Sequence, residues 1–327
     1  MKLMICANLG VGGLPAIDLP SSKIDQWQSD RVKALTMALK DASRRGAEVC
    51  IIAGGLFTQD FIAQSQLSAV MKTVGGHGIA VKYVPFLREL DGVEGRLPKT
   101  GALSVIVPRE DGRVDIKIEG TATSIPVVTG TGLEELEDVV RPHTPISIIR
   151  SGSDVGVALN GGSRLVRLGP LAASGFGDRI GSGYLLIETA DHKYSAEWIE
   201  CAVHPFVVCE VAIDRPQSSR ELVGTVGNAI KEVNRDACLR VELVGHLPLD
   251  VYINTDDLAE QLERYFFYVE VVDECRLDLN IADLDTDVSL LAEFVRRVVG
   301  DDSLSKAEKT RILRCGWNAL NGKGLAE

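Results

Sequence analysis

Apolar residues in the first 200 positions switch repeatedly between strand-like and helix-like spacing. Val49–Ala53 is a continuous apolar run, which is typical of a strand buried on both faces, and Lys2–Ala7 and Ile79–Val84 also predict strands. Helical spacing predicts an amphipathic helix over about residues 30–45 and another at about 60–74. This alternation of strands and helices predicts an α/β domain.

Further strands are predicted beyond residue 100. Leu103–Val107 and Val114–Glu119 alternate apolar and polar residues around Glu110-Asp111-Gly112, which is typical of a β-hairpin. Other short apolar runs predict strands at Ile125–Val128, Ile146–Ile149, Val155–Leu159, Tyr184–Glu188 and Ala196–Cys201. We therefore assign residues 1–202 to a first domain.

The pattern changes after this domain. Residues 203–284 predict a small β-α-β-α-β module in which Thr255 caps the second helix, and Phe267–Val272 suits either the end of that helix or a strand. Residues 285–327 predict two helices, of which the second follows a capping box formed by Ser305 and Glu308.

Length and charge limit the classes of protein that this chain can represent. Because one core rarely grows beyond about 250–300 residues, 327 residues favour two domains. The 46 acidic residues against 35 basic ones give a net charge of −11, which offers no support for nonspecific DNA binding. No apolar run reaches the roughly 18 residues of a membrane span. Seven scattered cysteines without a C-x-x-C pair fit reduced thiols, so we expect a cytoplasmic protein without a membrane partner.

Two glycine clusters suggest nucleotide sites but depart from the known patterns. In Gly10–Pro15 a proline stands where the dinucleotide-binding fingerprint has its third glycine, and in Thr129–Glu135 a glutamate stands there. The glycine-rich stretch 152–183 has no Gly-Lys-Ser/Thr sequence, so it is not a P-loop. We interpret these clusters as turns at strand ends.

Three strand ends carry an ordered series of motifs. They read Ala-Asn-Leu-Gly-Val-Gly at Ala7–Gly12, Ala-Gly-Gly-Leu-Phe at Ala53–Phe57 and Pro-Phe-Leu-Arg-Glu at Pro85–Glu89. This series resembles calcineurin-like metallophosphoesterases of the SbcD-like DNA repair exonuclease branch, whose strands end in Ala-Asp-Leu-His-Leu-Gly, Ala-Gly-Asp-Leu-Phe and Pro-Gly-Asn-His-Asp. The resemblance covers nearly all of residues 1–200. It implies a metallophosphoesterase-type β-sandwich flanked by helices, followed by a smaller α/β capping domain and C-terminal helices.

The positions at which that family binds metal are degenerate in this sequence. The vacated positions are Asn8, Gly10, Gly55, Leu87, Arg88, Arg150, Gly161 and Ser163. The family uses two manganese or similar divalent ions, which His, Asp and Asn side chains clamp together. Glycine and leucine have no donor atoms and arginine repels a metal ion, so we expect no metal cofactor. The resemblance therefore implies a non-catalytic scaffold or partner-binding protein. A metal-dependent phosphoesterase or exonuclease with a rearranged site, and a nucleotide-binding protein, stay open as alternatives.

The resemblance also implies a partner and a second use for the cleft. SbcD-like proteins work with an SMC-like SbcC-type ATPase that docks through helices after the capping domain, although here the helices of 285–327 can equally pack on their own domain. Four arginines at or near the vacated positions are candidates for bidentate binding of a phosphate group. They are Arg88, Arg150, Arg164 and Arg167. The alternative is that they pair with nearby carboxylates such as Glu89 and Asp154.

Overall fold

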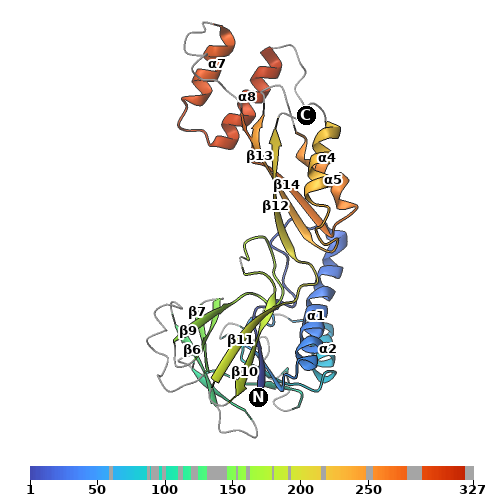
Figure 1. Ribbon diagram of the computed structural model, residues 1–327, viewed down its shortest axis with the longest axis vertical. Coiled ribbons are helices and arrows are strands. Elements are labelled where there is room, and N and C mark those ends of the chain that lie inside the picture. Colours follow the sequence, from blue (N-terminus) through green and yellow to red (C-terminus); the bar gives the residue numbers. More distant parts are fainter. Residues whose placement is uncertain are drawn as a thin grey trace. The chain divides into compact units, whose positions relative to one another are not determined.

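The computed structural model divides into two compact units, Met1–Phe206 and Val207–Glu327, and each is considered by itself (Figure 1). The structure describes residues 1–58, 62–86, 89, 96–97, 101–109, 113–118, 124–130, 146–151, 154–159, 163–178, 180–190, 193–214, 219–247, 253–277 and 289–320.

A six-stranded sheet forms the centre of the first unit, in the order β11-β10-β1-β2-β3-β4. Strands β1 to β4 are parallel, β10 is antiparallel to β1, and β11 is antiparallel to β10. The strands are β1 (Lys2–Cys6), β2 (Val49–Ile52), β3 (Ala80–Tyr83), β4 (Leu103–Val105), β10 (Gly183–Ala190) and β11 (Lys193–Glu200). The strands predicted at Lys2–Ala7, Val49–Ala53 and Ile79–Val84 are thus confirmed as neighbouring parallel strands.

Helices α1 (Ser21–Arg44) and α2 (Gln64–Gly75) pack on one face of this sheet. Alternate strand residues such as Met4 and Cys50 join the buried faces of both helices in one apolar cluster. Helix α1 begins at Ser21, earlier than its apolar spacing predicted, because its first turns are polar apart from Ile24 and Trp27.

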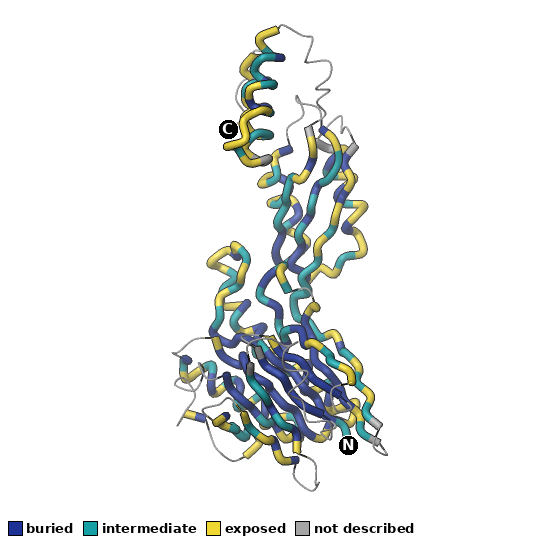
Figure 2. The backbone as a smooth tube through the Cα atoms, turned by 90° about the vertical axis from the view of Figure 1, so that its left-hand side faces the viewer, coloured by how far each residue is buried: buried dark blue, intermediate teal, exposed yellow. Residues whose placement is uncertain are grey.

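The opposite face of the sheet packs against a second sheet, in the order β5-β6-β7-β8-β9. Its strands are β5 (Val114–Lys117), β6 (Ser124–Gly130), β7 (Ile146–Ser151), β8 (Asp154–Leu159) and β9 (Arg164–Leu168). Leu3 and Ile51 of the first sheet share one buried cluster with Ile148 and Val157 of the second, and the buried strands are dark blue in Figure 2. Strands β1 and β2 are therefore covered on both faces, which explains their unbroken apolar sequence.

Among the described residues, the two strands of the predicted hairpin between residues 103 and 119 belong to different sheets, so their predicted pairing is wrong. Strand β4 pairs parallel with β3 in the first sheet, whereas β5 pairs antiparallel with β6 in the second. Alternating apolar residues indicate a half-buried strand without specifying its partner. The mixed α/β class is confirmed, while the finer assignment to a metallophosphoesterase fold stays a prediction.

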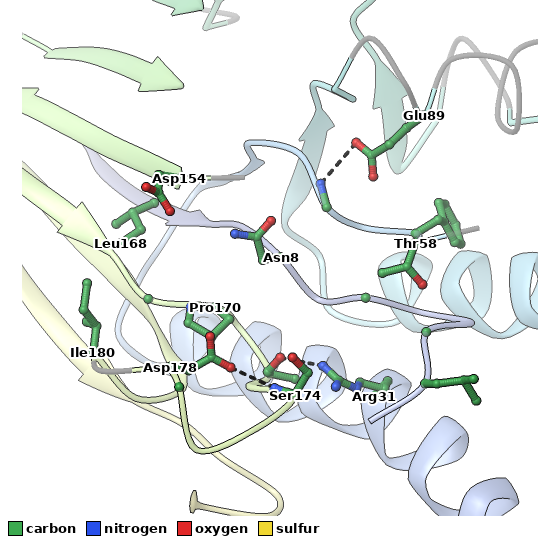
Figure 3. Close-up of a pocket in the computed structure, with 18 residues that line it drawn as sticks. Asn8, Arg31, Thr58, Glu89, Asp154, Leu168, Pro170, Ser174, Asp178 and Ile180 are labelled. Atoms are coloured by element: carbon green, nitrogen blue, oxygen red, sulfur yellow. Dashed lines mark hydrogen bonds between the residues drawn. The ribbon is translucent and has the colours of Figure 1, made fainter. Parts of the chain in front are cut away.

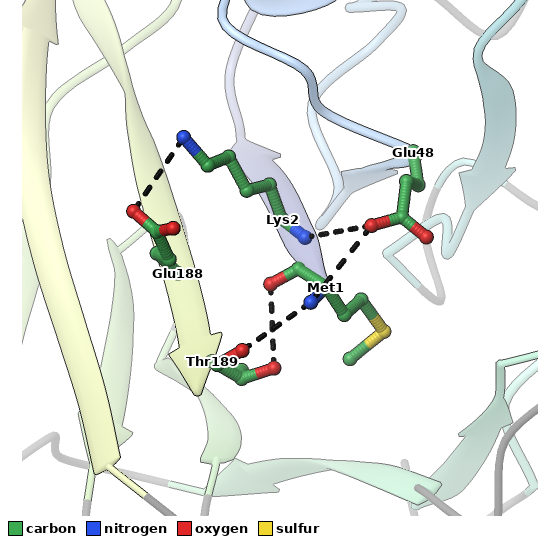
Figure 4. Close-up of polar contacts among 5 residues, drawn as sticks. All are labelled: Met1, Lys2, Glu48, Glu188 and Thr189. Carbon is green, nitrogen blue, oxygen red and sulfur yellow. Dashed lines mark hydrogen bonds and ion pairs between the residues drawn. The ribbon is translucent and has the colours of Figure 1, made fainter. Parts of the chain in front are cut away.

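Polar contacts fasten one end of β1 to its neighbours (Figure 4). The backbone N–H of Lys2 donates to Glu48 Oε1 at 3.1 Å, just before β2. The Lys2 ammonium lies 3.5 Å from Glu188 Oε2 on β10, and the Thr189 hydroxyl donates to the Met1 carbonyl at 3.3 Å. These contacts hold β1 in register between β2 and β10.

The second unit contains the predicted β-α-β-α-β order. Strands β12 (Phe206–Asp214), β13 (Cys238–Leu247) and β14 (Tyr268–Asp273) form a sheet, with β15 (Arg276–Leu277) paired to β13. Helices α4 (Ser219–Ala229) and α5 (Thr255–Glu263) share its buried cluster. The ambiguous segment is strand β14. The N-cap of α5 is Asn254 rather than Thr255, because the Asn254 side chain accepts from the Asp257 amide at 3.2 Å.

Two further helices follow, α7 (Leu290–Val299) and α8 (Lys306–Leu320), and they pack against each other. Val295, Val298 and Leu313 form the buried centre of this helical pair. The predicted capping box is present, since the Ser305 N–H donates to Glu308 Oε2 at 2.8 Å and the Glu308 N–H donates to Ser305 Oγ at 3.3 Å. Among the described residues, no helix is both long enough and apolar enough to cross a membrane.

Replacing two helical glycines with alanine should change the stability of the protein in opposite directions. A Cβ at Gly224 in α4 would meet open space, whereas a Cβ at Gly316 in α8 would overlap the Phe294 ring of α7. We expect Gly224→Ala to stabilise the protein by about 0.5–1 kcal/mol and Gly316→Ala to destabilise it by about 1–3 kcal/mol. Urea unfolding of the two variants measures this difference. Equal stabilisation by both would show that Phe294 moves aside without cost.

Candidate functional site

The loops that follow β1 and β2 run beside each other at the carboxyl edge of the first sheet. The Asn8 N–H donates to the Gly54 carbonyl at 3.0 Å, and the Gly10 N–H donates to the Gly55 carbonyl at 2.8 Å. A further parallel bridge joins Val11 to Phe57. Because parallel strands end at the same edge, this edge gathers the loops that the sequence singled out.

Gly55 and Asn8 lie in direct contact. Gly55 has a φ of +68° and Asn8 a φ of +53°, so both lie in the left-handed region. A Cβ built on Gly55 would collide with Asn8 Oδ1 and would lie 2.6 Å from Asn8 Cα. The backbone at position 55 therefore has room only for glycine.

Glu89 joins the loops that follow β2 and β3. Its Oε2 accepts from the Gly55 N–H at 3.1 Å and from the Phe86 N–H at 2.6 Å. The residue is only 9% exposed, so its carboxyl group is largely shielded from water. Burial raises the pKa of the Glu89 carboxyl, and the hydrogen bonds from the Phe86 and Gly55 amides oppose that rise.

Arg150 on β7 approaches the same strand ends from the second sheet. Its Nη1 donates to the carbonyls of Val84 at 3.1 Å and Pro85 at 2.9 Å, and its Nη2 donates to Thr129 Oγ1 at 3.2 Å. Burial lowers the pKa of the Arg150 guanidinium to about 10, while the Glu89 carboxylate acts in the opposite direction. Arg150 thus fastens the end of β3 to the second sheet.

Tyr83, the last residue of β3, completes this buried polar group. Burial raises the pKa of the Tyr83 hydroxyl, and the nearby negative charge of Glu89 raises it further. The Tyr83 hydroxyl and the Glu89 carboxylate also interact by a hydrogen bond, which raises the pKa of Tyr83 and opposes the rise in the pKa of Glu89. We define Glu89, Arg150 and Tyr83 as the buried polar group.

A pocket of about 800 Å³ opens at these loops (Figure 3). Its charged lining comprises Glu89, Asp154, Asp178 and Arg31. Asp178 Oδ2 accepts from the Ser174 N–H at 2.9 Å. Arg31 Nη1 donates to the Leu9 carbonyl at 3.0 Å and also to the Ala172 carbonyl. The described lining therefore contains three carboxylates and one guanidinium.

The structure brings some of the predicted site residues together. Asn8, Gly10 and Gly55 line the pocket. Arg150 is buried and is not part of the described lining, and neither are Ser163, Arg164 and Arg167 at β9. Leu87, Arg88 and Gly161 lie outside the described residues. Anion binding by the four arginines stays a prediction.

Glu89 and Arg31 are among the lining residues that were not predicted as site residues. Glu89 was considered only as a pairing partner for arginine, and its burial has no signature in the sequence. Arg31 had a detectable signal, because it lies four residues after Trp27 and before Leu35 on the buried stripe of α1. A charged residue on such a stripe indicates a specific polar environment.

The residues at the pocket do not fit the two-metal centre that the family resemblance implies. Gly10 and Gly55 carry no donor atoms, and the contact with Asn8 prevents any side chain at position 55. Within the described residues, no group of three or more His, Cys, Asp or Glu side chains is arranged to hold a metal ion. Comparison with models of known protein families gives no match, and a search of curated proteins gives none either.

Replacing Gly55 with alanine isolates the contact with Asn8. Gly78 has nearly the same φ, +69°, but a Cβ there would meet open space. Gly78→Ala therefore reports only the cost of placing a residue with a Cβ in the left-handed conformation, which is about 1–2 kcal/mol. We expect Gly55→Ala to cost about 1–3 kcal/mol more. Urea unfolding measures the loss in the free energy of unfolding for each variant. Equal losses in the two variants would show that Asn8 moves aside without a cost in stability.

The buried carboxyl of Glu89 predicts a pH dependence of stability. Its pKa in the folded chain is raised above the ordinary value of 4.5, so the folded state binds the proton more tightly than the unfolded state. Stability should therefore fall as pH rises from about 4.5 through the raised pKa. Glu89→Gln should lack this component, so its stability relative to wild type should increase across that window.

Urea unfolding between pH 4.5 and 7.5 measures this dependence, with Glu48→Gln at an exposed carboxylate as the control. A stability difference between Glu89→Gln and wild type that stays constant with pH would contradict the raised pKa.

Proposed function

We propose that the chain is a non-catalytic relative of the SbcD-like exonucleases that serves as a scaffold or partner-binding protein. The observation that supports this most is the contact between Gly55 and Asn8. In the resembling family a bridging aspartate stands at position 55, and here that position has no room for a side chain. A two-metal mechanism needs both ions held about 3.5–4 Å apart, which these residues do not provide.

The helical pair α7–α8 supports a partner-binding role. Its own buried centre is small, and apolar side chains remain exposed at Leu290, which is 72% exposed, and at Leu320, which is 45% exposed. We propose that this pair docks an SMC-like ATPase of the SbcC type, as the family resemblance implies. Single exposed apolar residues are common on protein surfaces, so this docking proposal rests on the family resemblance.

A hydrolase with a rearranged site is the competing proposal. The observation that favours it is the presence of carboxylates from Glu89 and Asp154 in one pocket. Carboxylates of this kind can bind a single divalent ion or act as a general base. Burial also raises the pKa of the Glu89 carboxyl, which is the direction expected of a carboxyl group that donates a proton.

One pair of measurements separates the two proposals. Elemental analysis of the purified chain should find no stoichiometric manganese, iron or zinc. A manganese-supplemented assay on linear DNA and on a generic phosphodiester should give no turnover above background. Glu89→Gln is the matched variant, because true catalysis at this pocket would disappear in it. Turnover that scales with wild-type protein and is lost in Glu89→Gln would establish the hydrolase instead.

A further inference from the structure

Strand β11 forms the outer edge of the first sheet, beside β10 (Figure 1). Among the described residues, no strand pairs with its other side. All eight residues of β11 pair with β10 in one unbroken antiparallel register, which runs from Gly183↔Glu200 to Ala190↔Lys193. The strand has neither a bulge nor a proline, two devices that commonly protect a sheet edge from further pairing. A long and regular edge of this kind can accept another strand.

The register shows which backbone groups face the outer edge. The Cys201 N–H donates to the Ser182 carbonyl at 3.0 Å, toward β10. Because the backbone groups of a strand alternate between its two sides, the odd-numbered residues of β11 bond to β10. The even-numbered residues therefore direct their N–H and C=O groups outward. In the middle of the strand these are Tyr194, Ala196 and Trp198.

The two faces of β11 differ in character. Tyr194, Ala196 and Trp198 pack partly against the buried cluster that the two sheets share. Ser195 and Glu197 point to the other face and are exposed. A second copy that is related by a two-fold axis perpendicular to the sheet keeps these faces aligned, because the axis maps each face onto itself. Such an axis also makes the two edge strands antiparallel.

We propose that β11 pairs antiparallel with β11 of a second copy of this chain, with the two-fold axis at Ala196. The outward N–H and C=O groups of each strand then bond to those of the other, as in recognition by strand addition. Tyr194 lies opposite Trp198 of the second copy and forms an aromatic cross-strand pair. Ser195 lies opposite Glu197 of the second copy. This interface goes beyond the scaffold role and does not depend on it.

The neighbouring registers are less favourable. An axis at Glu197 would place the two Glu197 carboxylates directly opposite each other, which is destabilising. An axis at Ser195 would pair only residues 193–197, because β11 begins at Lys193. An axis between two residues would bring outward backbone groups opposite groups that already bond to β10. The register at Ala196 avoids all three problems.

Analytical ultracentrifugation of the full chain at increasing concentration tests this interface. Wild type should show a reversible equilibrium between monomer and dimer. Ala196→Pro should raise the dissociation constant about tenfold or more, because it removes an outward N–H donor from each copy. The monomer should still fold, since a proline is tolerated where its nitrogen faces the edge of a sheet. Ala196→Ser keeps the donor and should dimerise as wild type does.

A charge exchange tests the register. Ser195→Glu should raise the dissociation constant about three- to tenfold, because it places a carboxylate opposite Glu197 of the second copy at two equivalent positions. Adding Glu197→Lys to this variant should restore dimerisation, since opposite charges then face each other. Higher salt should reduce both effects.

Several outcomes would overturn the proposal. These are a wild type that stays monomeric throughout the concentration range, a dimer that Ala196→Pro leaves unchanged, or a loss in Ser195→Glu that Glu197→Lys does not restore. If urea unfolding shows that Ala196→Pro does not fold, the charge exchange decides. DNA cleavage by the chain would refute the proposed function while leaving the result on dimerisation intact.

Discussion

The burial of β1 and β2 on both faces is the constraint on which the rest of the structure depends. Leu3 and Ile51 face the second sheet, whereas Met4 and Cys50 face the helices. Because neither face has room for a polar side chain, polar chemistry in these strands is confined to the loops at their ends. Burying each such apolar side chain contributes roughly 1.5–3 kcal/mol. The same packing that stabilises the first unit therefore also decides where its pocket lies.

The buried polar group connects that packing to the pocket. Arg150 extends from the second sheet to the carbonyls at the end of β3, and Glu89 joins the following loop to Gly55. Opposite charges inside a protein lose much of their hydration, so such groups contribute more to defining one arrangement than to net stability. Glu89 and Arg150 therefore help to determine how the strand-end loops meet.

Periodicity predicted much of the fold and little of the site. The parallel strands, the β-α-β-α-β order and the Ser305–Glu308 capping box follow from local spacing, which a sequence displays directly. The pairing of β4 and β5 with different sheets depends on contacts between distant segments, so alternation alone predicted a strand pairing that the described residues do not make. The burial of Glu89 and the inward course of Arg150 also arise from tertiary contacts, although the place of Arg31 on the apolar stripe of α1 was detectable.

The contact between Asn8 and Gly55 has a consequence for how this site can evolve. Position 55 cannot gain a larger residue while Asn8 keeps its present backbone, because the collision involves Asn8 Cα as well as its side chain. An acidic residue at position 55 would therefore be harmful when it arises alone, and its effect would depend on earlier change in the neighbouring loop. Such epistasis closes the single-step mutational path to a carboxylate at this position. Selection on this pocket is thus directed to residues such as Glu89, which reach it from a different loop.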